Sequence, residues 1–327
     1  MKAIVQDRYG SPDVLRLRDI DTPAPADDEV LVRVRAAAVN AYDWHIMRGD
    51  PYVMRLTVGL RGPRRKVRGR DVAGRVEAVG GAVTRFRPGD EVYGDLGEAD
   101  GAFAEYVCVA EDLIERKPAN LTFEEAAAMP LAAGTALVCL RDAARLRPGQ
   151  HVLINGASGG VGTFAVQLAK IYGAEVTAVC GTRNLDLVRS IGADHVVDYT
   201  ADDFTRGSRR YDVVCDLVGN RSLTEFRRAL TPTGTLVLSG GGVSTGGSIL
   251  GPLGLFARGK LLSRFVRHRL LMPTATPSRH NLATLRGLAE AGALTPVVDR
   301  TYPLSRTPEA IRYLEVEHAR AKVVITC

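Results

Sequence analysis

A short apolar run followed by a glycine cluster, between residues 150 and 170, constrains this chain more than any other stretch. Residues 152–154, VLI, form an unbroken aliphatic run, which is typical of a parallel strand buried on both faces. Residues 155–162 supply a glycine-containing turn, and apolar residues from Thr163 onward recur at helical spacing. The stretch therefore predicts a strand, a phosphate-binding turn and a helix, in that order.

The composition of this turn suits the pyrophosphate of a dinucleotide. Backbone N–H groups at a helix N-terminus are unpaired donors at the positive end of the helix dipole, and glycine lets phosphates approach them. The fingerprint G-x-G-x-x-G occurs here with alanine in its first position, as Ala157-x-Gly159-x-x-Gly162, directly after Gly156. The residues expected to contact the cofactor in this turn are Ser158, Gly159, Gly160, Val161 and Gly162.

The end of the second predicted strand selects between NAD and NADP. A carboxylate about 20 residues beyond the glycine turn would bind the ribose hydroxyls of NAD. The tip after strand 175–179 contains Gly181, Thr182 and Arg183 and holds no acid. Since an arginine fork matches the geometry of a 2′-phosphate, we expect NADPH rather than NADH. The alternative interpretation of Arg183 is a solvated arginine at the start of a helix.

Composition bounds the class of protein. A chain of 327 residues that is 46% hydrophobic is long enough for two domains with cores of their own. The net charge of +6 comes from arginines spread along the chain, which is not a nucleic-acid signature. Their densest run, residues 61–70, is interpreted as a solvated loop rather than an anion site. Five dispersed cysteines and the lack of a signal peptide or membrane-length apolar run predict a soluble, cytoplasmic protein with no membrane partner.

The order of the predicted elements divides the chain in two. Residues 1–120 contain β-type runs separated by Pro and Gly turns. A helix that is expected to be interrupted at Pro130 and Gly134 follows, and strands and helices then alternate to about residue 239, as in a doubly wound parallel sheet. Residues 240–280 break this rhythm. The predicted fold class is α/β, with a mid-chain Rossmann sheet and a separate β-rich domain.

The chain resembles the medium-chain dehydrogenase/reductase superfamily, in its zinc-free quinone oxidoreductase-like branch, over essentially its whole length. Besides the glycine fingerprint, the motifs that carry the resemblance, in family order, are Ala38-Val39-Asn40, residues 69–74, 89–93, 101–106 and 131–135, and finally 322–325. The resemblance implies a GroES-like catalytic domain formed by residues 1–120 and 275–327. It also implies a Rossmann domain at 121–274, and a cleft between the domains where the nicotinamide meets the substrate.

The resemblance also sets the expected metal content. Zinc-dependent members of the superfamily hold a Lewis-acidic zinc ion with Cys and His ligands, whereas the corresponding positions here carry Asn40, Arg70 and Leu131. Cys108 is the only cysteine among the first 120 residues, so the four-cysteine structural lobe is missing. We therefore expect no metal, and a hydride acceptor that is polarised by protein donors.

The candidate catalytic residues Asn40, Tyr42 and His45 follow from the resemblance, which places them on a loop near the nicotinamide. His45 stands where many relatives have a tyrosine, and a histidine is a suitable general acid at neutral pH. Packing of His45 and Trp44 at the domain interface is the alternative. Asp43 is expected to fix the loop as a hydrogen-bond acceptor.

Further cofactor contacts are implied by the resemblance alone. Tyr199 is expected near the adenosine phosphate, and Val218 beside the adenosine ribose. Lys322 is expected to close over the phosphates, with a surface lysine as the alternative. It follows Ala321, where the family usually has glycine. The remaining implied contacts are Thr135 at the carboxamide and Ser239, Gly240 and Gly241 at the strand end that faces the nicotinamide.

The expected function is zinc-independent transfer of hydride from NADPH to a small quinone or α,β-unsaturated carbonyl, by a homodimer with a mostly apolar substrate cleft. Residues 240–280 are expected to form either a lid over the substrate or a dimer contact across a two-fold axis. Two other functions stay open. One is a zinc-free alcohol, aldehyde or enoyl reductase of the same superfamily, and the other is an NADP-binding sensor or structural protein without turnover.

Overall fold

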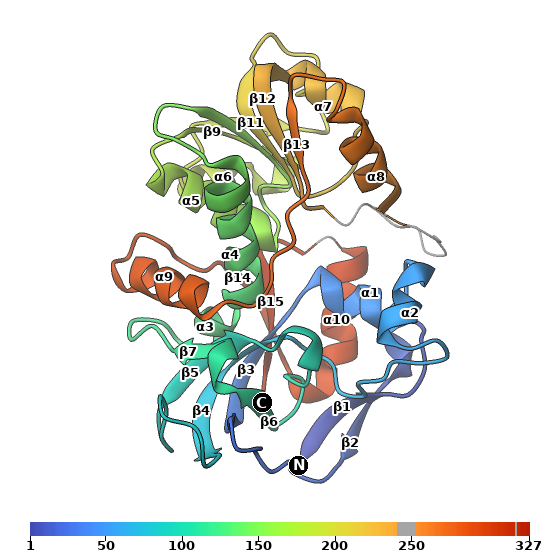
Figure 1. Cartoon of the computed structure of the whole chain (residues 1–327), viewed down its shortest axis with the longest axis vertical. Coiled ribbons are helices and arrows are strands. Elements are labelled where there is room, and N and C mark those ends of the chain that lie inside the picture. The colour runs from blue at the N-terminus through green and yellow to red at the C-terminus, as the bar shows by residue number, and fades with distance from the viewer. Residues whose placement is uncertain (241–250, 252, 318) are drawn as a thin grey trace. The chain divides into compact units, whose positions relative to one another are not determined.

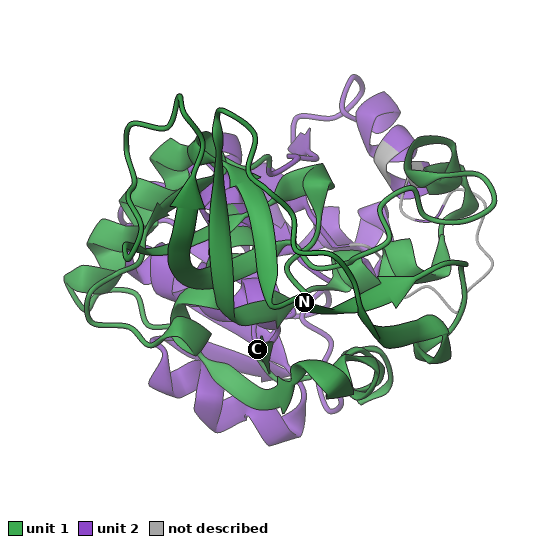
Figure 2. Cartoon of the chain, turned by 90° about the horizontal axis from the view of Figure 1, so that it is seen from below, with its two compact units in different colours: residues 1–134, 276–327 green, residues 135–275 purple. Residues whose placement is uncertain are grey.

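The computed structural model describes residues 1–240, 251, 253–317 and 319–327, and it divides into two compact units. Unit 1 comprises Met1–Gly134 and Thr276–Cys327, and unit 2 comprises Thr135–Ala275 (Figure 2). The first boundary therefore lies later in the chain than the predicted 120/121. The reason is that helix α3 (Phe123–Ala127) packs against strands β3 and β4 of unit 1.

Unit 2 is built on a six-stranded parallel sheet with the strand order β10-β9-β8-β11-β12-β13 (Figure 1). Numbered from β8, this order is the 3-2-1-4-5-6 of a doubly wound dinucleotide-binding sheet, whose topological switch point lies between β8 and β11. The strands are β8 (His151–Asn155), β9 (Glu175–Cys180), β10 (His195–Asp198), β11 (Tyr211–Asp216), β12 (Leu230–Leu238) and β13 (Arg269–Leu271). The helices are α5 (Gly160–Ile171), α6 (Leu185–Ser190), α7 (Leu223–Ala229) and α8 (Leu253–Leu262). The predicted Rossmann sheet is thus confirmed.

The segment whose place the sequence left open contributes to this sheet. Its described part forms α8 and the sixth strand β13, which pairs in parallel with β12. Residues 241–250 lie outside the described part of the chain. The choice between a lid and a dimer contact stays a prediction.

Unit 1 is the β-rich domain that the sequence predicts. Its main sheet has seven strands in the order β14-β15-β3-β4-β5-β7 with β6 paired to β3, and β1 and β2 form a separate hairpin. The strands are β1 (Lys2–Gln6), β2 (Leu15–Asp19), β3 (Glu29–Val39), β4 (Asp71–Val79), β5 (Glu91–Asp95), β6 (Tyr106–Ala110), β7 (Ile114–Arg116), β14 (Val298–Pro303) and β15 (Lys322–Thr326). Besides α3, the helices are α1 (Ala41–Arg48), α2 (Arg55–Val58), α9 (Arg279–Glu290) and α10 (Thr307–Val316). Because β15 pairs antiparallel with β3, the C-terminal strand lies beside the strand that leads into α1.

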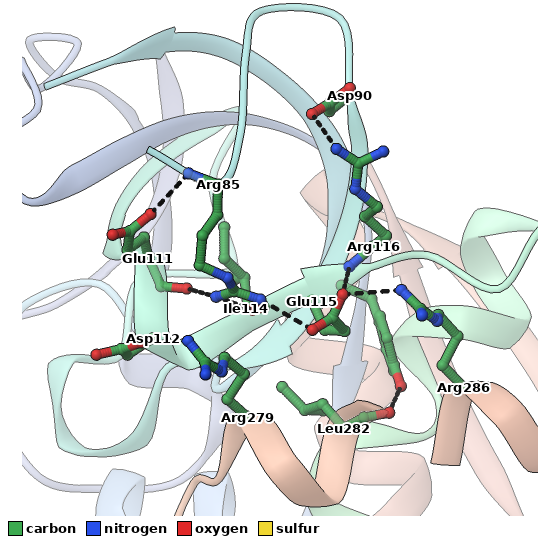
Figure 3. Close-up of polar contacts among 11 residues, drawn as sticks. Arg85, Asp90, Glu111, Asp112, Ile114, Glu115, Arg116, Arg279, Leu282 and Arg286 are labelled. Atoms are coloured by element: carbon green, nitrogen blue, oxygen red, sulfur yellow. Dashed lines mark hydrogen bonds and ion pairs between the residues drawn. The ribbon is translucent and has the colours of Figure 1, made fainter. Parts of the chain in front are cut away.

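Helix α9 is attached to the main sheet of unit 1 by polar contacts (Figure 3). The Glu115 carboxylate on β7 lies between two guanidinium groups, accepting hydrogen bonds from Arg85 and from Arg286 of α9, each at 2.9 Å. The Tyr93 hydroxyl donates to the Leu282 carbonyl of α9 at 2.7 Å. Together with the buried side chains of Leu282 and Leu285, these bonds hold α9 in unit 1.

One predicted interruption is wrong. Helix α4 (Pro130–Leu137) begins at Pro130, as the sequence predicts, but it continues through Gly134 and passes into a π-helical segment, Val138–Ala144. A glycine inside a helix costs only about 1 kcal/mol relative to alanine. Most other residues of α4, among them Ala133 and Ala136, are buried, and their packing outweighs that cost.

Candidate active site

The glycine turn lies at the end of β8 and leads into α5. Gly156 has φ +86°, a left-handed conformation, and a Cβ there would lie 2.7 Å from Val218 Cγ2 at the end of β11. A Cβ on Gly162 would lie 2.1 Å from the Gly156 carbonyl oxygen. Glycine is therefore required at both positions, so that α5 can start close to the switch point of the sheet.

The N-terminus of α5 has backbone N–H groups that are available to a ligand. Its N-cap is Gly159, which provides no side-chain cap, and the first N–H groups of a helix have no acceptor within the helix. Among the described contacts, Thr163 is the first residue of α5 whose N–H bonds to the preceding turn, at 3.0 Å from the Gly159 oxygen. The turn therefore fits a dinucleotide pyrophosphate, which would accept from the N–H groups of Gly160, Val161 and Gly162.

Two buried polar residues link the ends of β8 and β11 at the switch point, and the sequence analysis did not identify them. Asn155 ends β8, and its Nδ2 donates to Asp216 Oδ1 at the end of β11 at 2.8 Å. Asp216 also accepts from the backbone N–H groups of Val218, at 3.2 Å, and Gly219, at 3.1 Å. A polar residue that terminates an apolar strand is the signal that could have identified both. The pair fixes the loop that carries Val218 against the glycine turn.

The C-terminal end of β9, where the adenosine ribose is expected, has a carboxylate beside it that the sequence spacing did not reveal. Thr182 follows β9, and its hydroxyl donates to Asp198 Oδ2 of the adjacent strand β10 at 2.5 Å. Hydrogen bonds from Thr182 and Thr200 lower the pKa of Asp198, so its carboxylate is ionised near neutral pH. The tip itself holds no acid, but strand pairing brings the carboxylate of residue 198 beside it.

The other predicted contacts at this end lie together. A Cβ on Gly181 would lie 3.2 Å from the Tyr199 hydroxyl, so the phenol covers that glycine. Asn184 Nδ2 donates to Ser158 Oγ at 3.0 Å, which ties the loop after β9 to the glycine turn. The exposed Arg183 lies between these contacts in a short 3-10 turn, Thr182–Asn184.

The remaining predicted cofactor residues fall in different places. The N–H groups of Ser239 and Gly240, beyond β12, donate to the Asp216 carbonyl at 2.9 and 3.0 Å, which brings them to the switch point. Thr135 is in α4. Gly241 lies outside the described residues.

In unit 1 the predicted residue Asn40 belongs to a buried polar network centred on Asp71. Asn40 is the N-cap of α1, and its Nδ2 donates to Asp71 Oδ2 at 3.0 Å. The backbone N–H of Leu131 donates to Asp71 Oδ1 at 2.9 Å. The Lys322 ammonium lies 2.6 Å from Asn40 Oδ1 and 3.3 Å from Asp71 Oδ2. Segments that are far apart in sequence thus converge on one carboxylate.

Lys322 is buried, which contradicts the interpretation as a surface lysine. Its ammonium has three donors, and they have three acceptors, because the Val39 carbonyl accepts as well, at 3.3 Å. The side chain is 2% exposed, and the expected closure over the cofactor phosphates stays a prediction. The preceding Ala321 has φ +60°, which explains why the family favours glycine there: an L-residue in this region is strained by about 1–2 kcal/mol.

The positions that resemble zinc ligands do not fit a zinc ion. Asn40 is engaged by Lys322 and Asp71, and the aliphatic side chain of Leu131 offers no ligand atom, although its backbone N–H donates to Asp71. Arg70 forms a two-pronged pair with Asp95, at 2.8 and 2.7 Å. An amide, a guanidinium and an aliphatic side chain therefore stand where thiolate and imidazole ligands would be needed.

The candidate proton donors Tyr42 and His45 lie on α1. The Arg70 guanidinium lies 4.7 Å from the centre of the Tyr42 ring, and burial raises the pKa of Tyr42 to about 12. His45 stacks on Trp44 with ring centroids 3.8 Å apart, and its Nδ1 lies 2.8 Å from the Asp50 carbonyl oxygen. A carbonyl only accepts, so Nδ1 carries the proton. Burial lowers the pKa of His45, and its Nε2 therefore carries no proton at neutral pH.

Asp43 fixes the start of α1, as expected. Its Oδ2 accepts the backbone N–H of Asn40 at 2.7 Å, and the side chain is 1% exposed. Burial, with a contribution from the nearby Asp100 carboxylate, raises the pKa of Asp43 to about 8. Near neutral pH this carboxyl group is therefore largely protonated.

Comparison with known proteins gives consistent matches over the whole chain. Residues 26–119 match the family model of the alcohol dehydrogenase GroES-like domain, and residues 191–325 match that of zinc-binding dehydrogenases. The quinone-oxidoreductase homolog of Spinacia oleracea chloroplasts is 34% identical over 99% of this chain and 98% of its own length. The NADPH-dependent alkenal/one oxidoreductase of Arabidopsis thaliana chloroplasts is 36% identical over 99% of this chain and 79% of its own length.

A solved structure agrees with the sequence matches. The quinone oxidoreductase of Coxiella burnetii superposes with a TM-score of 0.88 at 30% identity, covering 100% of this chain and 99% of its own. No helix in the described part of the chain is both long and apolar enough to cross a bilayer.

Proposed function

This chain belongs to the medium-chain dehydrogenase/reductase family, in its quinone oxidoreductase-like branch, and on that premise we propose that it is an NADPH-dependent reductase of quinones or α,β-unsaturated carbonyls. The observation that carries the proposal is the glycine turn at the switch point of a 3-2-1-4-5-6 sheet. That site binds dinucleotides by its backbone geometry, and the similar proteins carry quinone and alkenal/one reductase names.

Unit 2 is proposed to hold the cofactor. The N–H groups at the start of α5 would bind the pyrophosphate, and Ser158 would donate its hydroxyl proton, since its oxygen already accepts from Asn184. Arg183, beside Tyr199 and Gly181, would bind the 2′-phosphate. When bound, NADPH supplies the hydride for the reaction. The dependence of the Arabidopsis relative on NADPH supports this choice of cofactor.

Unit 1 is proposed to supply the proton and to orient the acceptor. At neutral pH the Tyr42 hydroxyl is protonated, since its pKa of about 12 lies well above 7, and it can donate a hydrogen bond to a carbonyl oxygen. His45 would position α1 through its bond to the Asp50 carbonyl. The Asn40–Asp71–Lys322 network would keep the start of α1 in place. We propose that the reaction needs no zinc, since the zinc-like positions hold the amide of Asn40, the guanidinium of Arg70 and the aliphatic side chain of Leu131.

NADPH oxidation tests the proposed function, with NADH run in parallel. A suitable acceptor panel contains a benzoquinone, a naphthoquinone, an enone, a 2-alkenal and a saturated aldehyde. Turnover of a quinone or enone, in protein that contains no stoichiometric zinc by metal analysis, would support the proposal. Turnover of the saturated aldehyde alone would favour an alcohol or aldehyde reductase. NADPH binding without any turnover would favour a sensor or structural protein.

We also propose that the protein is a homodimer. In the described part of unit 2, β13 is the terminal strand and pairs only with β12. Such an edge is open to a strand of a second copy. Sedimentation equilibrium measures the mass directly, and a concentration-independent mass of about 35 kDa, the chain mass of 35.2 kDa, would contradict the proposal.

The proposed location is the cytoplasm. All five cysteines are free thiols, and Cys139, Cys180 and Cys215 are buried, which agrees with a reducing compartment. Alkylation of the unfolded protein, after it is taken from cells under acid quench, should modify five thiols. Fewer than five would indicate disulfides and contradict this location.

A further inference from the structure

A pocket of about 220 Å³ lies at the edge of the unit 2 sheet where its strands begin. Its lining includes Gln150, directly before β8, Asp212, the second residue of β11, and Arg269 at the start of β13. Arg145 and Arg147, from the connection that leads into β8, complete its charged lining. The pocket is thus formed by loops and strand starts of a single unit.

Positive charge exceeds negative charge in this pocket. Three arginines line it against the single carboxylate of Asp212. The Asp212 carboxylate is already engaged, since it accepts from the His151 backbone N–H at 3.0 Å and from the Thr231 hydroxyl at 3.4 Å. In the described part of the chain no carboxylate pairs with Arg145 or Arg147. Arg145 and Arg147 thus line the pocket without a carboxylate partner among the described residues.

The backbone holds these arginines in a defined turn. Arg145 has φ +54°, which is unusual for a residue with a side chain, and the next N–H, that of Leu146, donates to the Leu140 carbonyl at 2.9 Å. The Arg147 N–H donates to Gln150 Oε1 at 2.9 Å. This bond orients the Gln150 amide so that its NH₂ group remains as a donor. Thr231 and Thr233 also line the pocket, and of these Thr231 already donates its hydroxyl proton to Asp212.

The pocket is separate from the proposed cofactor site. The glycine turn follows Asn155 at the C-terminal end of β8, whereas the pocket adjoins the N-terminal end of the same strand at His151. Four steps along a strand span about 13 Å. A phosphate bound in the pocket would therefore not occupy the pyrophosphate position at α5.

We propose that this pocket binds a small phosphate-bearing anion with two or more negative charges. Arginine forks pair with phosphate oxygens in two-pronged geometry, and amide and hydroxyl donors complete the set. The pocket is too small for a dinucleotide but holds one or two phosphate groups. The inference is independent of the proposed function, because it rests only on the residues at the opposite edge of the sheet.

Isothermal titration with inorganic pyrophosphate tests the inference, in buffer that contains saturating NADP⁺ to occupy the cofactor site. The pocket variant is Arg145→Gln/Arg147→Gln. The matched control is Arg209→Gln/Arg210→Gln, which removes two positive charges from the segment before β11 but none from the pocket lining. We expect saturable binding to the wild type, at least tenfold weaker binding to the pocket variant, and less than a threefold change in the control.

Two results would overturn the inference. One is the absence of pyrophosphate binding to the wild type in saturating NADP⁺, and the other is equal weakening of binding in both double variants. If the double variant does not fold, Arg269→Gln removes a third lining arginine and should weaken binding in the same direction. If the chain does not bind NADP⁺ at all, the proposed function fails. The comparison of pyrophosphate affinity between the pocket variant and the control still shows whether the pocket binds the anion.

Discussion

The Nζ atom of Lys322 lies 3.3 Å from Asp71 Oδ2, and the two side chains are 2% and 0% exposed. Burial raises the pKa of Asp71, and the Lys322 ammonium counteracts this. A pair of this kind contributes little beyond what an apolar pair would, but removing one partner leaves a buried charge without compensation. The pair therefore joins the C-terminal strand β15 to β3 and β4 in a way that a single substitution would disrupt.

Lys322→Met should destabilise the protein by about 3–5 kcal/mol, because it leaves the buried Asp71 carboxyl without its cation. The matched control is Lys2→Met, which removes an exposed pair with Asp19 at 3.2 Å and should cost at most about 1 kcal/mol. Urea unfolding gives both values. Equal costs for the two variants would contradict the buried pair, and a selective rise in the KM for NADPH would instead restore the predicted phosphate contact.

Asp43→Asn should make stability less dependent on pH. The pKa of Asp43 is raised from 3.8 to about 8, so the folded state keeps a proton that the unfolded chain releases near pH 4. This contribution is complete in acid and is lost as the pH rises through about 8. Asn mimics the protonated carboxyl, so the fall in stability between pH 5 and pH 9 should be smaller in the variant. Asp13→Asn, at an exposed position, is the control, and identical pH profiles in all three proteins would contradict the raised pKa.

Tyr42→Phe should lower kcat by roughly 100-fold at pH 7, the usual contribution of a positioned proton donor. His45→Phe should have a much smaller effect, because the neutral imidazole has its proton on Nδ1. The pH dependence of kcat separates the two residues. A rate that rises as the pH falls below 6.5, and that loses this rise in His45→Phe, would show that the imidazolium is the acid after all.

Asp198→Asn should lower the KM for NADPH by roughly two- to fivefold, because the Asp198 carboxylate adds a negative charge near the predicted 2′-phosphate position. The KM for NADH should not fall, since NADH lacks this phosphate. Asp202→Asn, on an exposed neighbouring residue, is the charge-matched control. A higher KM for both cofactors in Asp198→Asn would show that the carboxylate binds ribose hydroxyls instead.

Sequence patterns predicted the structural elements that are determined by residues close together in the chain. The glycine spacing around Gly156 and Gly162 predicted the turn, since close backbone approach leaves no room for a Cβ at either position. The apolar run before Asn155 predicted β8, because a strand buried on both faces is apolar throughout. The alternation of strands and helices predicted the parallel sheet, because parallel strands need long crossover connections and these are usually helices.

Strand pairing and side-chain direction could not be predicted from spacing alone. Asp198 reaches the tip of β9 only because β10 pairs with β9 in a register that places residues 198 and 180 side by side. Lys322 points inward because β15 pairs with β3 and brings its ammonium to Asn40. Both contacts depend on long-range pairing, which leaves no local signature.

The most direct test of NADPH-dependent reduction is kcat/KM for NADPH and for NADH with a naphthoquinone, in the wild type and in Arg183→Ala. The wild type should prefer NADPH at least tenfold. The loss of a charged hydrogen bond to the 2′-phosphate should raise the KM for NADPH roughly 10- to 100-fold in the variant, with the KM for NADH changed by less than threefold. Equal effects on both cofactors would contradict the role of Arg183. The absence of NADPH oxidation with every quinone and enone would contradict the proposed function itself.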